Sequence, residues 1–421
     1  MTGPFAIIRD AMLGEEVWCA TTAKGLRLRI APMPRFVETA AVCNFEYGSI
    51  DLGFVQDGMP HASPEGVAHY LEHKLFEDEA IQVFERFGRR GARVNATTGF
   101  SCTSYHFTAT DRFGENLADL LHLVARAHLT AENVAKERGI IAQEIRMHED
   151  SPDYQAIFAL LGCLYPHHPV RHPVGGTVES IARITCEELA ACHAAFYRTG
   201  NAALGIAGPV DPHEVLALAE ACTLASGAPA ERLTAEDRAP PAQQRIERTV
   251  GAARPRLLLG FKDQDPPHTP LARVERDLAV RVLLDRLFGA ASEIRDDLRR
   301  RGIADDSLGA TYLGDRGFSA VVVHGESEAP ERLLAELQRL LAGELPFSEE
   351  HLERVRRKML GQYVRMFENV KAMAGLHASE ALHGLAPFQA MERLARLGVP
   401  ELQELARRLF APAWSAVAVV R

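Results

Sequence analysis

The stretch SPEGVAHYLEHKLFEDE, residues 63–79, contains two histidines and a glutamate in the order H-x-x-E-H. It predicts a helix with Ser63 as the N-cap and Pro64 in the first helical position. His69, Glu72 and His73 then share one helix face, because positions i, i+3 and i+4 are neighbours on a helix surface. Two imidazoles at this spacing can hold one Zn²⁺, and the glutamate between them is close enough to take a proton from a zinc-bound water.

A second predicted helix, TAENVAKERGIIAQEIRMHED at residues 130–150, carries two glutamates on its apolar face. The apolar stripe consists of Val134, Ile141 and Ile145. Glu137 and Glu144, seven residues apart, fall in the middle of that stripe. Buried carboxylates need a cation or hydrogen-bond donors to offset their desolvation. A zinc ion already held by two neutral histidines would supply the cation.

Catalytic zinc sites use three protein ligands and leave one position open for water. His69, His73 and one of the two glutamates, Glu137 or Glu144, would complete that count. The other glutamate would orient a histidine or the water from the second coordination shell. Glu72 is left as the general base, which takes a proton from the water and passes it to the leaving amine.

Together these motifs resemble the pitrilysin/insulinase family of inverted-zincin metallopeptidases, which includes the mitochondrial processing peptidases. In that family H-x-x-E-H is followed some seventy residues later by E-x6-E, whose second glutamate binds zinc. Seventy residues separate His73 from Glu144, slightly fewer than is usual in the family. The resemblance implies one Zn²⁺ per chain, bound by His69, His73 and Glu144. It also implies two catalytic carboxylates, Glu72 as the base and Glu137 in the second shell.

The segment GARVNATTGFSCTSYHF, residues 91–107, is similar to the family's G-x-x-N-A-x-T segment. In the family this is an edge strand onto which substrate is laid by backbone pairing. Asn95, Ala96 and Tyr105 match its pattern and are the substrate-binding residues that the resemblance implies.

Strand-like segments open and close both halves of the chain. The first half opens with LRLRIAPM and closes with AALGIAGPV; the second opens with RPRLLLGFKD and closes with WSAVAVV. Between the halves, residues 226–246 are rich in Pro, Ala, Gly and charge and predict a linker. We therefore expect an α+β protein with two homologous domains, 1–225 and 247–421, each a sheet backed by helices.

The resemblance extends over nearly the whole chain and is strongest to a bacterial branch of short, two-domain members. It rests on residues 168–181, 208–212 and 287–307. It implies two α/β-sandwich domains of the mitochondrial-processing-peptidase-like, or LuxS-like, metallohydrolase fold, each with a mainly antiparallel sheet. Four such halves enclose a chamber in the family, which implies peptides or unfolded proteins as substrates.

Composition narrows the range of partners and compartments. The chain has 421 residues and a formal net charge of -9, which argues against nucleic acid as a partner. No run of 18 apolar residues is present, so we expect no membrane-spanning helix and no membrane partner. Seven scattered cysteines, none in a CxxC pair, are typical of a reducing compartment, and we expect a cytoplasmic protein.

One family feature is missing from the second half. Active members carry a segment L-R-x-x-x-G-x-x-Y, whose Arg and Tyr hold substrate near the zinc. Aligned on Gly302, these positions are Leu298 and Asp305 in this chain. Unless the register differs or Tyr312 replaces the tyrosine, a homologous subunit must supply the pair, and we expect a heterodimer.

Two other classes of function share part of this pattern. The small autoinducer-producing lyases also carry H-x-x-E-H, but their third ligand is a cysteine and their chains are far shorter. A non-catalytic chamber or assembly subunit, like the core proteins of respiratory complexes, would share the fold. Such subunits usually lose motif residues, whereas all five are present here. The sequence therefore favours a zinc metalloendopeptidase.

Overall fold

The computed structural model describes residues 4–10, 13–77, 83–234, 237–343, 345 and 347–421. The chain forms two compact units that are interleaved in sequence. The first unit comprises residues 1–143, 173–233 and 362–389; the second comprises 144–172, 234–361 and 390–421. The expected division into domains 1–225 and 247–421, with a linker at 226–246, stays a prediction.

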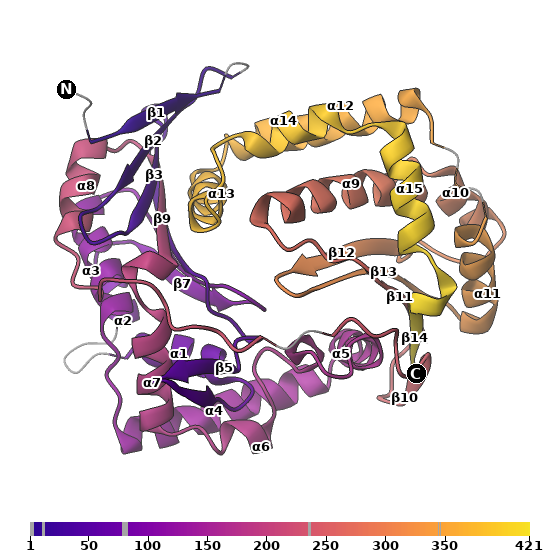
Figure 1. Cartoon of the computed structure of the whole chain (residues 1–421), viewed down its shortest axis with the longest axis horizontal. Coiled ribbons are helices and arrows are strands. Elements are labelled where there is room, and N and C mark those ends of the chain that lie inside the picture. The colour runs from indigo at the N-terminus through magenta and orange to yellow at the C-terminus, as the bar shows by residue number, and fades with distance from the viewer. Residues whose placement is uncertain (1–3, 11–12, 78–82, 235–236, 344, 346) are drawn as a thin grey trace. The chain divides into compact units, whose positions relative to one another are not determined.

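A seven-stranded mixed sheet forms the centre of the first unit, in the order β1-β2-β3-β9-β4-β8-β7 (Figure 1). Its strands are β1 (Ala6–Arg9), β2 (Glu16–Thr21), β3 (Arg27–Pro32), β4 (Thr39–Phe45), β7 (Arg93–Thr98), β8 (Thr103–Ala109) and β9 (Ala202–Gly208). Only the β3–β9 pair is parallel among these neighbours. β5 (Gly53–Gln56) and β6 (Met59–Ala62) form a separate hairpin.

Helices cover both faces of this sheet. In the first half of the chain, α1 (Val67–Leu75), α2 (Val83–Gly88), α3 (Phe113–Ala125) and α8 (Pro212–Glu220) contact the sheet. The unit also contains α6 (Val178–Ile181), α7 (Cys186–Phe196) and most of α4 (Ala131–Glu149). α3 and α8 contact one face of the sheet, and α13 (Val370–Leu382) lies across β3, β9 and β4 on the other (Figure 1). A helix from near the end of the sequence thus completes the first unit.

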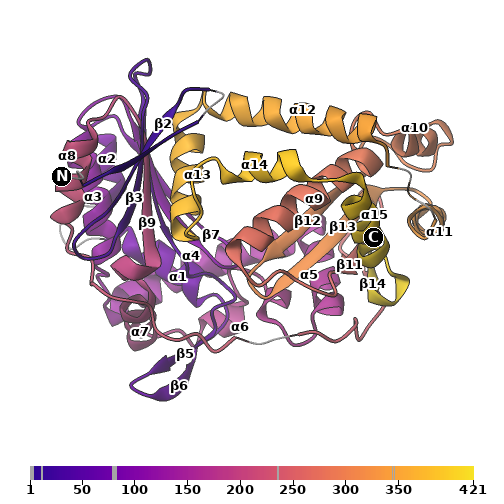
Figure 2. The ribbon, with the colours of Figure 1, turned by 45° about the horizontal axis from the view of Figure 1, so that its top comes forward.

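The second unit is built in the same way around a five-stranded mixed sheet, in the order β10-β14-β11-β13-β12. Its strands are β10 (Arg245–Arg248), β11 (Arg256–Lys262), β12 (Gly309–Asp315), β13 (Phe318–Glu326) and β14 (Ser415–Val420). Its helices are α5 (Pro152–Leu164), α9 (Pro270–Phe288), α10 (Glu293–Arg300), α11 (Pro330–Leu341), α12 (Glu349–Met366), α14 (Gln389–Arg396) and α15 (Val399–Leu409). α5 packs on β11 and β14, so here a helix from the first half covers the sheet (Figure 2).

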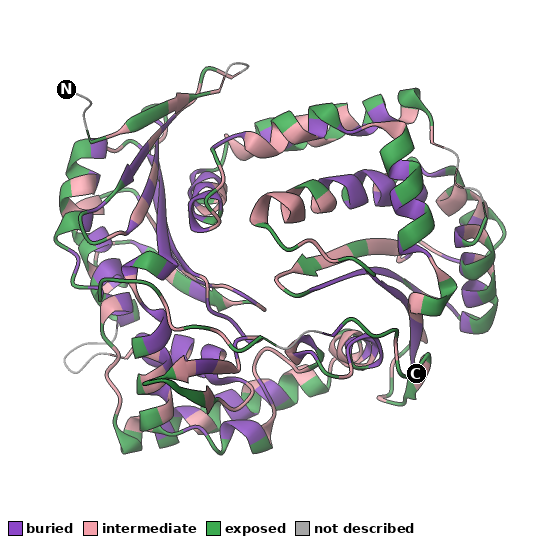
Figure 3. Ribbon diagram, in the orientation of Figure 1, coloured by how far each residue is buried: buried purple, intermediate pink, exposed green. Residues whose placement is uncertain are grey.

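A glycine on a central strand allows each of these two helices to pack closely. A Cβ on Gly205 of β9 would lie 2.0 Å from the carbonyl oxygen of Ala374 in α13. A Cβ on Gly260 of β11 would lie 2.9 Å from the side chains of Leu160 and Leu164 in α5. The central strands of both sheets are buried, as Figure 3 shows. The expected α+β fold, with mainly antiparallel sheets backed by helices, is confirmed.

The start of the first motif helix differs from the prediction. Ser63 and Pro64 precede the helix, which begins at Val67 with Gly66 as its N-cap. Gly66 has a φ of 88°, in the left-handed region, so the helix cannot extend back through it. A Cβ there would lie 2.4 Å from the carbonyl oxygen of Gly175, which requires a glycine at this position. Residues 78 and 79 of the predicted helix lie outside the described residues.

Within the described part of the chain, no helix combines the length and the apolar composition that crossing a lipid bilayer requires.

Candidate metal centre

Helix α1 is buried on both sides, which fixes the direction of its motif face. It contacts β7 and α7. Tyr70 and Lys74, on the side away from the histidines, are both fully buried. The Tyr70 hydroxyl donates to the carbonyl oxygen of Val134, and the Lys74 ammonium donates to the carbonyl oxygen of Asn133 over 3.3 Å. These two bonds attach α1 to the first turn of α4.

Helix α4 presents the predicted apolar stripe. Val134, Ile141 and Ile145 are all buried, with exposed fractions of 3% or less. Glu137 is buried on the same face, and Glu144 is half-buried two turns further along. The boundary between the two compact units follows Gln143, within this continuous helix, so Glu144 is placed by the helix it shares with Glu137.

His69, His73 and Glu144 form a group that could hold a metal ion. One ligand atom from each lies within 4.8 Å of the other two. The two imidazole rings are 4.6 Å apart between centroids. Tetrahedral zinc with bonds of about 2.0–2.1 Å would bring such atoms to about 3.3 Å from one another. Two imidazoles and one carboxylate are a donor set that catalytic zinc uses, so these residues fit the ion.

Glu137 lies outside that group and contacts one of its members. His73 Nδ1 and Glu137 Oε1 are 2.9 Å apart. The hydrogen bond with His73 lowers the pKa of Glu137, against the opposing effect of burial. With the carboxylate ionised, Nδ1 carries the proton and donates, which leaves Nε2 as the nitrogen available to a metal.

Glu72 is buried beside the two histidines and is bound by Thr98, which is the threonine of the N-A-x-T pattern but was assigned no role on the basis of the sequence. The Thr98 hydroxyl, at the end of β7, donates to Glu72 Oε2 over 2.5 Å. Strand alternation could have indicated Thr98, since it lies two residues after Ala96 and shares its face. The sequence motifs also did not indicate the residues around Glu144. His148 Nε2 lies 3.6 Å from Glu144 Oε1, and the His148 ring stacks on the Tyr154 ring.

The three expected substrate-binding residues have different environments. Asn95 is exposed on β7, the edge strand of the sheet, while Ala96 is 6% exposed and faces inward. Tyr105 pairs with Ala96 across the β7–β8 ladder. Its side chain is fully buried, and its hydroxyl lies 2.7 Å from the hydroxyl of Tyr197. Burial raises the pKa of Tyr105 well above its ordinary value.

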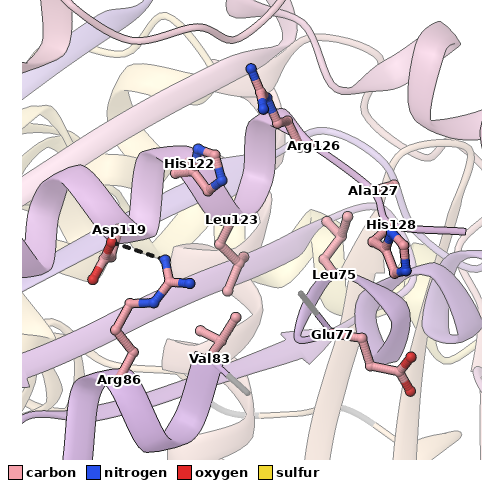
Figure 4. A pocket seen from close by; sticks show the side chains of 10 residues that line it. All are labelled: Leu75, Glu77, Val83, Arg86, Asp119, His122, Leu123, Arg126, Ala127 and His128. Carbon is pink, nitrogen blue, oxygen red and sulfur yellow. Dashed lines mark hydrogen bonds and ion pairs between the residues drawn. The ribbon is translucent and has the colours of Figure 1, made fainter. Parts of the chain in front are cut away.

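A pocket of about 190 Å³ lies beyond the end of α1. Figure 4 shows its lining side chains, among them Leu75 of α1, Val83 of α2 and Leu123 of α3. None of the three candidate metal ligands lines it, so it is separate from the metal centre.

Comparison with known proteins shows the family to which the chain belongs. Residues 54–178 match the family model described as insulinase (peptidase family M16), and residues 183–359 match the peptidase M16 inactive domain. A Bacillus subtilis protein named uncharacterized zinc protease YmfH is 31% identical over 409 residues, which cover 94% of this chain and 95% of the relative. The chain belongs to the M16 peptidase family. Another Bacillus subtilis relative, uncharacterized zinc protease YmxG, is 25% identical over 86% of this chain and 90% of its own.

Two solved structures share the fold along nearly the whole chain. An M16-like peptidase from Alicyclobacillus acidocaldarius superposes with a TM-score of 0.90 and 33% identity, covering 100% of this chain and 99% of that one. A protease from Helicobacter pylori superposes with a TM-score of 0.81 at 18% identity, covering 96% and 98%. The two-unit architecture is therefore that of the M16 family, whose curated bacterial relatives carry the name zinc protease.

Proposed function

We propose that the chain is a zinc-dependent endopeptidase that hydrolyses peptides or extended protein segments inside a closed chamber. The observation that carries this proposal is the meeting of His69, His73 and Glu144 on two helices, with Glu72 on the same helix turn as the histidines. One zinc ion per chain would be held by these three ligands.

The protein's own residues supply the positioning and the proton transfer. A bound zinc ion would polarise the scissile carbonyl and acidify a water molecule in its open coordination position. Glu72 then accepts a proton from the attacking water and donates it to the leaving amine. Glu137 holds the His73 ring through Nδ1 and keeps it in the tautomer that can bind a metal.

Strand β7 is the element to which we assign the substrate. It is an edge strand, so its outer backbone groups can pair with an extended peptide. Asn95 and Ala96 would lie against that peptide. Tyr105 would act indirectly, because its buried side chain and its register with Ala96 support the strand from the inner side.

The structure supports the expectation that this chain lacks the substrate-holding Arg and Tyr. Leu298 is fully buried in the core of the second unit. Asp305 pairs with Arg254 over 2.6 Å, and hydrogen bonds from Ser307 help lower its pKa to about 2. Tyr312, the alternative tyrosine, has a buried hydroxyl whose pKa is raised by desolvation. Leu298 has no donor group, Asp305 is held as an ionised acceptor, and the Tyr312 hydroxyl is enclosed away from solvent.

We therefore propose that a homologous subunit completes the site as a heterodimer. Pitrilysin superposes on this chain with a TM-score of 0.71 at 15% identity, and the match covers 46% of its length. The fold therefore occurs in chains about twice as long. A pair of short chains would contain the same number of these folded units as one long chain. All seven cysteines lie among the described residues and are thiols rather than disulfides, which supports the cytoplasm as the compartment in which the pair works.

A non-catalytic assembly subunit is the alternative. One observation favours it: a chain of complex III from Candida albicans has the same fold, with a TM-score of 0.70 at 14% identity. An assembly role does not require a complete His–His–Glu group beside a buried glutamate, so the presence of this group favours the peptidase.

Peptide cleavage with a matched variant tests the two functions. A quenched fluorogenic peptide library is incubated with the zinc-loaded chain, alone and with a homologue that carries the Arg/Tyr segment. We expect weak cleavage alone and strong cleavage after mixing. Glu72→Gln should keep its zinc and lose turnover by roughly 10² to 10⁴ or more. Wild-type turnover in Glu72→Gln would refute its role as the base, and strong cleavage by the chain alone would refute the heterodimer.

A further inference from the structure

We propose that Thr98 is a positioning residue for Glu72 and that it couples the edge strand β7 to the general base. The inference rests on the proposed function, since it concerns the base of that site. It starts from one contact, the hydrogen bond of 2.5 Å from Thr98 Oγ1 to Glu72 Oε2.

The contact joins two elements that have different tasks. Glu72 lies in α1 between the two histidines, and Thr98 is the last residue of β7. Glu72 is 8% exposed, so few water molecules can reach its carboxylate. A hydroxyl that donates to a carboxylate forms a short, strong hydrogen bond. In a buried site it fixes the rotation of the carboxylate as well as stabilising its charge.

The other end of the contact is anchored by the turn that follows β7. Gly99 N donates to the carbonyl oxygen of Cys102 over 2.8 Å, and Ser49 N donates to the carbonyl oxygen of Gly99 over 3.0 Å. Gly48 packs so closely on this turn that a Cβ would lie 2.5 Å from the carbonyl oxygen of Phe100. The position of the Thr98 hydroxyl is therefore set by main chain on both sides of the strand end.

This arrangement has a consequence for substrate. Thr98 and Ala96 share the face of β7 that is turned towards α1, whereas the outer edge of the same strand is open to pairing. A peptide that pairs with β7 would therefore order the strand that carries the hydroxyl. Extended substrates would align the base, and Thr98 would contribute to turnover and not to peptide affinity.

Single-turnover cleavage of a fluorogenic peptide by excess zinc-loaded chain, mixed with the homologue that carries the Arg/Tyr segment, measures the effect. Thr98→Val removes the donor and keeps the shape, so we expect the maximal rate to fall about 10- to 100-fold with the half-saturating concentration unchanged. Thr98→Ser keeps the donor and should restore most of the rate. Thr108→Val on β8, outside the site, is the matched control and should cleave like the wild type. A Thr98→Val rate equal to the wild-type rate would overturn the proposal.

A second readout uses the zinc-free chain and needs no activity. Thermal unfolding is measured for wild type, Thr98→Val, Glu72→Ala and the double variant. We expect Thr98→Val to lower the melting temperature in the wild-type background and not in the Glu72→Ala background. Equal shifts of the melting temperature in both backgrounds would show that Thr98 and Glu72 are not coupled and would overturn the proposal. If the coupling is present but zinc-loaded wild type never cleaves, the proposed function fails while Thr98 still holds Glu72.

Discussion

Replacing Glu137 by glutamine separates the orientation of a metal ligand from the binding of the metal itself. The Glu137 carboxylate accepts a hydrogen bond of 2.9 Å from His73 Nδ1, and that bond lowers the pKa of Glu137. Glutamine keeps an oxygen acceptor of the same length but removes the charge. A hydrogen bond to a charged group contributes about 1.5–3 kcal/mol, against about 0.5–1.5 kcal/mol for a neutral pair.

The midpoints of these two ranges differ by about 1.25 kcal/mol, so we expect Glu137→Gln to raise the zinc dissociation constant about eightfold. Glu137→Ala leaves Nδ1 without an acceptor and should approach 100-fold. Competition with a chromophoric zinc chelator measures both constants at neutral pH. Glu132→Gln, in the exposed first turn of the same helix, is the matched control and should bind like wild type. Unchanged affinity in Glu137→Ala would refute the argument, as would a loss as large as that in Glu144→Gln.

The remaining predictions concern stability. Gly205→Ala places a Cβ 2.0 Å from the carbonyl oxygen of Ala374, so α13 must move away from β9. We expect the free energy of unfolding, measured with denaturant, to fall by ~3 kcal/mol or more, the upper end of overpacking costs. An unfolding midpoint equal to that of the wild type would show that α13 does not pack there. Burial lowers the pKa of His168 from 6.5 to about 4. Between pH 6.5 and pH 4 this histidine is therefore protonated in the unfolded chain and neutral in the folded one. The free energy of unfolding should fall by about 3 kcal/mol as the pH drops from 6.5 to 4. His168→Asn keeps an acceptor for the Val170 amide and should flatten that part of the pH profile; an unchanged slope would contradict the assignment to His168.

Sequence patterns predicted which residues meet at the candidate site more fully than they predicted its surroundings. His69, His73 and Glu144 come together because helical periodicity alone puts each on an inward face, and periodicity can be read from a sequence. Helical periodicity also puts Lys74 on the side of the helix away from the histidines, but it does not show that this side is interior. There the Lys74 ammonium donates to the carbonyl oxygen of Asn133 and pairs with the Glu77 carboxylate. Amphipathic patterns show which face is apolar, and they do not show that a second element covers the opposite face.

The exchange of helices between the two units was also outside the reach of sequence patterns. α13 is an apolar helix in the second half of the chain, yet it packs on β9 of the first unit. α13 packs on the sheet of the first unit because its backbone can approach β9 closely at Gly205, which lies more than 160 residues earlier in the chain. Likewise, the start of α1 depends on the contact between Gly66 and Gly175, so a capping pattern at Ser63 was a misleading local signal.

We propose that three side chains from α1 and α4 bind one zinc ion. Native mass spectrometry of the zinc-loaded chain, with His69→Ala, His73→Ala and Glu144→Gln measured alongside, tests it most directly. We expect one zinc per wild-type chain and a marked loss of zinc in each variant at the same free zinc concentration, because each variant lacks one of the three protein ligands. One full equivalent of zinc in His69→Ala or His73→Ala would contradict it.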